Sequence, residues 1–176
     1  MSLLPTASQT VGPYVAIVLA SGERREIVEP SNPAALRLRG HLYDGAGAGV
    51  PDGLVELWYG PEDPGPGANG SPPTWPAGFG RCLTGPDGGF SFVLTKPHAG
   101  SDAGAPHVEV LVFARGLLRS LRSRMYFPDE AGRNATDPVL GAVGEERRDT
   151  LVARSEGGEL RFDIRLQGEH ETVFFG

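Results

Sequence analysis

The chain has 176 residues, of which 39% are hydrophobic, with one cysteine and a formal net charge of −6. This length and composition suit one domain, 1–176, with a core of its own. The lone Cys82 excludes an internal disulfide framework and a multi-cysteine zinc site, as expected in a reducing cytoplasm. The acidic balance argues against nucleic acid as a partner, and no apolar run is long enough to span a membrane.

Glycine and proline punctuate the chain, with 26 and 16 copies, so most apolar runs between them are too short for helices. We therefore predict an all-β protein with a β-sandwich core of roughly eight strands and long Gly/Pro-rich loops. Residues 1–14 read as an N-terminal arm and 21–35 as a loop, so that 1–35 together precede the sandwich. Val11, Tyr14 and Ile17 give the arm apolar groups with which to dock.

Strands are predicted in chain order from alternating or β-branched runs, at 36–43, 54–59, 90–95, 104–116, 124–127, 150–154, 160–166 and 171–175. Long irregular loops are predicted over 60–76 and 96–106, where glycine and proline accumulate. Residues 117–122 suit a short helical turn, and 137–143 are compatible with a helix. The strand over 104–116 is the strongest of these predictions.

A side-chain period of two divides that strand into an apolar face and a mixed face. The apolar face consists of Val108, Val110, Val112 and Ala114. The mixed face begins with His107 and Glu109 and ends with Arg115. At about 3.3 Å per residue, His107 and Arg115 lie about 26 Å apart, so one small-molecule site cannot use both.

Each end of the mixed face allows two interpretations. His107 and Glu109 at i and i+2 have ligand-like spacing, but with no second histidine nearby we favour an exposed polar pair. A self-sufficient metal site from His41, His107 and Glu109 is the least favoured alternative. Arg115 offers a rigid fork for a carboxylate, and an ordinary solvated strand end fits it equally well. No nucleophile elbow or phosphate loop occurs in the sequence.

Several motifs occur in the order typical of one enzyme family. They are 8–14 (SQTVGPY), 41–45, 50–58 (VPDGLVELW), 79–81, 95–97, 105–107, 113–116 (FARG), 126–127, 161–165 (RFDIR) and 171–175 (ETVFF). Together they resemble the intradiol ring-cleaving dioxygenases, and within that family the subunit type that carries no iron. The resemblance covers most of the chain and implies a β-sandwich paired with a homologous, iron-bearing beta subunit.

In the iron-bearing subunits of this family, two tyrosinates and two histidines hold a non-haem Fe(III). This chain departs from that pattern at three of the four positions. The loop 60–73 and the segment 98–105 hold no tyrosine, and the histidine pair corresponds to His107 and Glu109. The resemblance therefore implies a vestigial metal position at His107, with no metal in this chain and Fe(III) in the partner.

The family's substrate pocket lies between the two subunits. By resemblance, this chain lends to it Thr10, Gly12, Pro13 and Tyr14 of the arm together with Arg115. The implied reaction cleaves protocatechuate with O2 to 3-carboxy-cis,cis-muconate, in the beta-ketoadipate pathway of aromatic catabolism.

The resemblance places no catalytic residue in this chain, so the isolated subunit is expected to be inactive. It is expected to form a heterodimer and higher oligomers with the beta subunit. The alternative left open is a stand-alone β-sandwich binding module that kept the fold and lost the enzyme.

Overall fold

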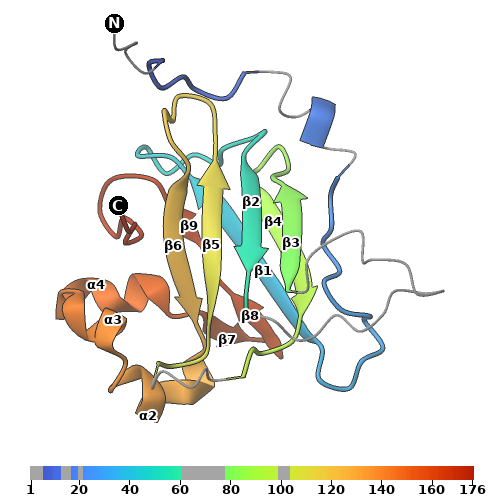
Figure 1. The fold of residues 1–176 in the computed structure, drawn as a ribbon, viewed down its shortest axis with the longest axis vertical. Helices are drawn as coiled ribbons and strands as arrows, with labels where there is room; N and C mark the ends of the chain where they lie inside the picture. Colours follow the sequence, from blue (N-terminus) through green and yellow to red (C-terminus); the bar gives the residue numbers. More distant parts are fainter. Residues whose placement is uncertain (1–5, 13–16, 20–21, 61–77, 99–103) are drawn as a thin grey trace, which may run out of the picture.

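The computed structural model describes residues 6–12, 17–19, 22–60, 78–98 and 104–176, which form two β-sheets and a helical insertion (Figure 1). Nine strands lie in this part of the chain. Buried hydrophobic residues from both sheets pack in a common cluster, so the sheets share a core. This arrangement confirms the predicted all-β sandwich.

The first sheet has the strand order β3-β2-β5-β6, and each pair of adjacent strands in it is antiparallel. Its strands are β2 (Leu54–Trp58), β3 (Phe79–Leu83), β5 (His107–Phe113) and β6 (Leu121–Tyr126). In the register, Glu109 of β5 lies opposite Trp58 on one side and Arg124 on the other. The predicted central strand is thus an inner strand with partners on both edges.

The second sheet has the order β4-β1-β8-β7, and β9 also pairs with β1. Its strands are β1 (Leu36–Tyr43), β4 (Gly89–Leu94), β7 (Arg154–Glu156), β8 (Glu159–Arg161) and β9 (Ile164–Arg165). β1 runs antiparallel to β4 and parallel to β8 and β9. The chain therefore crosses between the sheets more than once: β4 pairs with β1 before β5 and β6 complete the other sheet, and β8 and β9 return beside β1 afterwards.

The period-two pattern of β5 is confirmed. Val108, Val110 and Val112 are fully buried and pack in the common cluster with Leu38 and Leu42 of the opposite sheet. Because successive side chains point to opposite faces, the mixed face of β5 is directed away from this core. Burial of the valines stabilises β5 by roughly 25 cal/mol per Å² of apolar surface removed from water.

The predicted strand 160–166 is broken into β8 and β9, and Gly40 explains the break. The backbone N–H of Phe162 donates to the carbonyl of Arg39, and Asp163 Oδ1 accepts from the N–H of His41 at 3.0 Å. This arrangement brings the Phe162 carbonyl so close to Gly40 that a Cβ there would lie 1.9 Å from its oxygen. Only glycine leaves room for so close a backbone approach.

A helical insertion separates β6 from β7 and lies at the end of the sandwich where β5 begins (Figure 1). It consists of the 3-10 helices η2 (Pro128–Glu130) and η3 (Asp149–Leu151) and the helices α2 (Ala131–Asn134), α3 (Pro138–Ala142) and α4 (Glu145–Arg148). Asp137 caps α3, because its Oδ1 accepts from the N–H groups of Val139 and Leu140, both at 2.9 Å.

Asp137 also ties the insertion to the sheet. Its Oδ2 accepts from the N–H of Ala105 at 2.8 Å, and its Oδ1 from the hydroxyl of Tyr126 at 3.1 Å. Burial would raise the pKa of Asp137, but these hydrogen bonds outweigh it and lower the pKa. Burial and the Asp137 carboxylate together raise the pKa of Tyr126 to about 12, which keeps its hydroxyl a donor.

Other local predictions were wrong. Residues 121 and 122 do not continue a helical turn from 117 but begin β6, because Leu121 pairs with Val112 across the sheet. Residues 150 and 151 belong to η3, and β7 begins only at Arg154. Residues 171–175 form no strand, although the N–H of Phe175 donates to the carbonyl of Arg122 at 2.7 Å. β3, with glycine and arginine at its centre, was not predicted.

Candidate functional site

The carboxyl end of β5 brings together residues from three parts of the chain. The backbone N–H of Gly116 donates to Thr10 Oγ1 at 2.7 Å, which fixes the arm beside Arg115. Asp52 belongs to the turn between β1 and β2, and its Oδ2 accepts a hydrogen bond from Arg115 Nη2 at 3.2 Å. Gly116 has φ +90°, a conformation that favours glycine. We call Thr10, Asp52, Arg115 and Gly116 the arm end.

Solvent reaches the arm end freely. The side chains of Arg115 and Asp52 are 64% and 60% exposed. Gly12 is also exposed, and a Cβ added to it would meet no described atom within 4 Å. The structure thus places Thr10 beside the Arg115–Gly116 segment, and no atom of the described residues crowds Gly12. The other predicted arm residues, Pro13 and Tyr14, lie outside the described residues.

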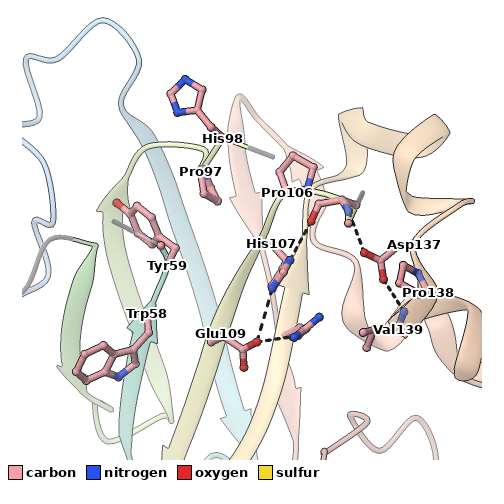
Figure 2. Close-up of a pocket in the computed structure, with 14 residues that line it drawn as sticks. Trp58, Tyr59, Pro97, His98, Pro106, His107, Glu109, Asp137, Pro138 and Val139 are labelled. Carbon is pink, nitrogen blue, oxygen red and sulfur yellow. Dashed lines mark hydrogen bonds and ion pairs between the residues drawn. The ribbon is translucent and has the colours of Figure 1, made fainter. Parts of the chain in front are cut away.

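A second feature lies at the opposite end of β5, where a cavity of about 410 Å³ opens between the sheet and the insertion (Figure 2). Its lining includes Trp58, Tyr59, His98, His107, Glu109 and Arg124. His107 Nδ1 lies 2.9 Å from the carbonyl oxygen of Ala105, and Nε2 lies 3.6 Å from Glu109 Oε1. We call this cavity the His107 pocket.

Glu109 is held in the His107 pocket by two arginines. Arg124 Nε donates to Glu109 Oε1 at 2.7 Å, and Arg122 Nε donates to Oε2 at 3.2 Å. Burial raises the pKa of Glu109, but the nearby His107 imidazole and the charges of Arg124 and Arg122 outweigh it and bring the pKa down to about 2. Glu109 is therefore an ionised carboxylate whose two oxygens are both engaged.

This donor set does not fit a ferric ion. Ferric iron requires several anionic ligands, whereas Glu109, the carboxylate beside His107, is already neutralised by arginines. Within the described ranges, no group of three or more His, Cys, Asp or Glu side chains lies close enough to hold a metal. His41 belongs to β1 in the other sheet, where its Nδ1 lies 3.1 Å from Arg161 Nη2. The alternative metal site of His41, His107 and Glu109 is thus wrong.

Trp58 and Tyr59 also line this pocket, a position that no sequence motif had assigned to them. Trp58 is 38% exposed and lies opposite Glu109, on the mixed face of the sheet. Its indole Nε1 donates to Glu56 Oε2 at 3.3 Å, which orients the ring. A signal for Trp58 was present in the sequence: Trp58 lies two residues after the charged Glu56, so both side chains point to the same face of the strand. A charged residue marks the face directed away from the core.

The lowered pKa of Glu109 predicts a pH dependence of stability. The carboxylate stabilises the folded state fully above its unfolded pKa near 4.5, and this contribution disappears as the pH falls to about 2. Glu109→Gln should therefore cost about 1–2 kcal/mol at pH 7, a value reduced from that of a buried pair because solvent reaches Arg122. Urea unfolding at several pH values would measure it.

The difference between wild type and Glu109→Gln should shrink steadily between pH 4.5 and pH 2. The matched control is Glu29→Gln, which removes an exposed carboxylate for which we expect no such trend. A difference that stays constant over this pH range would contradict the ion-pair network as the cause.

The described part of the chain holds no helix long and apolar enough to cross a membrane. Its sandwich is similar to the dioxygenase domain of a dioxygenase and carbohydrate-binding protein fusion from Streptomyces sp. SirexAA-E, with a TM-score of 0.62 and 27% identity. That match covers 83% of this chain and 88% of the other. The fold therefore places the chain in the class of intradiol-dioxygenase sandwiches.

Sequence relatives narrow this class. The chain is 37% identical to a protocatechuate 3,4-dioxygenase alpha chain from Burkholderia cepacia and 38% identical to one from Pseudomonas putida, over 99% of this chain and 98% of each relative. It is also 32% identical to the Burkholderia cepacia beta chain, over 54% of this chain and 46% of that one. No protein-family model matches. The chain belongs to the family of protocatechuate 3,4-dioxygenase alpha chains.

Proposed function

We propose that the chain is a site-completing subunit of an intradiol ring-cleaving dioxygenase. Its partner would be a homologous beta subunit that carries Fe(III), and the assembly would cleave protocatechuate with O2 to 3-carboxy-cis,cis-muconate. The contact between Thr10 and Gly116 supports this proposal most directly, because it joins the arm to the Arg115 end of β5. These are the two segments that the family resemblance assigns to the substrate pocket.

The chemistry of Arg115 suits an aromatic carboxylate. A guanidinium presents five N–H donors in a planar fork, and Arg115 has 64% of its side chain exposed to solvent. A protein with a net charge of −6 needs such a local cation to attract an anionic substrate. Arg115 would hold or steer the carboxylate of protocatechuate, while the two hydroxyl groups of the ring face the partner's metal.

The arm would complete the same pocket. Gly12 carries no side chain, so the backbone there can approach a flat ring closely, and no atom of the described residues lies within 4 Å of the place a Cβ would take. Pro13 and Tyr14 follow directly and are proposed to contact the substrate, with residues 1–35 docking on the partner subunit. The chain would thus form heterodimers, and higher oligomers built from them.

Iron activation would be the work of the partner. In this chain, His107 is the remaining family-type ligand, and Glu109 is bound to Arg124 and Arg122 instead. A free, buried Cys82 is compatible with the reducing cytoplasm where we expect this enzyme to work. The competing possibility of a stand-alone binding module gains no support from the near full-length alpha-chain relatives.

The test is to produce this chain alone and together with a beta-type partner. We expect the isolated chain to hold no stoichiometric iron and to show no ring cleavage of protocatechuate. The co-expressed pair should co-purify, contain iron and consume O2 with protocatechuate. Metal analysis by mass spectrometry and an oxygen-electrode assay measure both properties on the same samples.

Ferric iron at one equivalent with activity in the isolated chain would overturn the assignment of iron to the partner. A chain that fails to bind any beta-type partner but remains folded would instead favour the stand-alone module. Benzoate, which keeps the carboxylate and lacks both hydroxyl groups, is the control substrate and should not be cleaved.

A further inference from the structure

The turn that carries Asp52 is anchored more firmly than an exposed turn requires. Thr84, which is buried, donates its hydroxyl to the carbonyl of Val50 at 2.7 Å and accepts from the N–H of Gly53 at 2.8 Å. The N–H of Thr84 in turn donates to the carbonyl of Gly53 at 2.8 Å. These bonds hold both sides of Asp52, so its backbone has little freedom.

The backbone of Asp52 itself adopts an uncommon conformation. Its φ is +58°, in the left-handed region that favours glycine and that aspartate and asparagine tolerate better than other residues. This conformation belongs to the turn that places the carboxylate within 3.2 Å of Arg115 Nη2. The carboxylate thus extends from a firmly held backbone and faces a long and flexible cation.

The ion pair is too exposed to be explained as a stabilising device. Pairs with both partners mostly in solvent typically contribute about 0–1 kcal/mol to folding. The hydrogen bond between Asp52 and Arg115 uses one nitrogen, Nη2, of a guanidinium that has five N–H groups. Arg115 can therefore keep this bond and present its remaining donors to a second carboxylate.

We propose that Asp52 is a positioning residue that orients the Arg115 guanidinium for the carboxylate of the substrate. This inference rests on the proposed function of Arg115. The long side chain of Arg115 can adopt many rotamers. If Asp52 holds it in one rotamer before the substrate binds, part of the entropy cost of substrate binding is removed. Asp52 does not touch the substrate and acts only through Arg115.

Two variants separate the side chain of Asp52 from its backbone. Asp52→Gly accommodates φ +58° without strain and removes the acceptor, whereas Asp52→Asn keeps both the left-handed conformation and an acceptor oxygen. In the complex with the iron-bearing partner, Asp52→Gly should raise the KM for protocatechuate about fivefold with kcat within twofold. Asp52→Asn should restore KM to within about twofold of wild type.

A double-mutant cycle tests whether Asp52 acts through Arg115. In an Arg115→Ala background, Asp52→Gly should cause no further change in KM. A fivefold rise that persists without Arg115, or a KM that Asp52→Gly leaves unchanged, would overturn the positioning role. The proposed function fails separately, if the wild-type complex does not cleave protocatechuate or Arg115→Ala has no effect.

A second readout does not depend on activity. In crystals of the complex, the Arg115 side chain should occupy one conformation in wild type and Asp52→Asn, and several in Asp52→Gly. A single, unchanged Arg115 conformation in Asp52→Gly would overturn the inference even if the complex proved inactive.

Discussion

Replacing Arg115 with alanine in the assembled enzyme is expected to lower kcat/KM for protocatechuate by about 5- to 150-fold, or about 1–3 kcal/mol. This range is typical for the loss of a hydrogen bond to a charged group. The loss should be smaller for a substrate without the carboxylate, because only the carboxylate meets the guanidinium. Steady-state oxygen consumption with protocatechuate and catechol would measure both.

Two variants make the effect of Arg115→Ala specific. Arg119→Ala removes the same charge from an exposed position on the same β5–β6 connection and should change kcat/KM by less than about twofold. Arg115→Lys keeps the charge but not the planar fork, so we expect an intermediate loss. Unchanged kinetics in Arg115→Ala would remove this residue from the pocket, and with it the main support for the arm end as the functional site.

Replacing Gly40 with alanine is expected to destabilise the fold by about 3 kcal/mol or more, at the upper end of the range for overpacked cores. The new Cβ would lie 1.9 Å from the carbonyl oxygen of Phe162 and 2.5 Å from Cζ of Phe90. The Phe90 ring can rotate, but the Phe162 backbone is bonded to β1 through its N–H. Relief therefore requires β1 and the C-terminal segment to separate. Urea unfolding of the purified chain would measure the loss.

The matched control is Gly132→Ala in α2, where a new Cβ meets nothing within 4 Å among the described residues. Alanine stabilises helical positions relative to glycine by about 0.5–1 kcal/mol, so this variant should be neutral or slightly more stable. If Gly40→Ala proved as stable as wild type, the approach of Phe162 to β1 in the structure would be wrong.

The sequence predicted the strands whose side chains alternate regularly and missed those whose position depends on distant partners. β1 has the predicted bounds, and β5 buries the predicted apolar face, because alternation within one strand is a local property. β3 lacks that signal, since Gly80 and Arg81 interrupt it, and it exists because it pairs along β2. Likewise, Gly40 and Phe162 break the C-terminal run through a contact that no local pattern records.

The sequence indicated those residues of the candidate site that belong to family-like motifs. Thr10 and Arg115 came from family-like motifs, and the bond between Thr10 and Gly116 brings them together. Asp52 lies in the motif 50–58, but only the structure shows that it faces Arg115, 63 residues away in sequence. At Glu109, the family resemblance indicated only that a metal-binding histidine is missing. That Arg122 and Arg124 bind its carboxylate follows from the pairing of β5 with β6, which the sequence alone does not reveal.

The pairing of Glu109 with Arg122 and Arg124 would make the proposed loss of a metal position difficult to reverse. Glu109→His alone would leave two guanidinium groups beside the new imidazole with no anion between them, which disfavours both folding and any bound cation. Replacing an arginine first would instead leave the Glu109 carboxylate undercompensated. Each single step is therefore penalised, so these three positions would have to change together, and under the proposed division of roles this would help to keep the subunit dependent on its partner for iron.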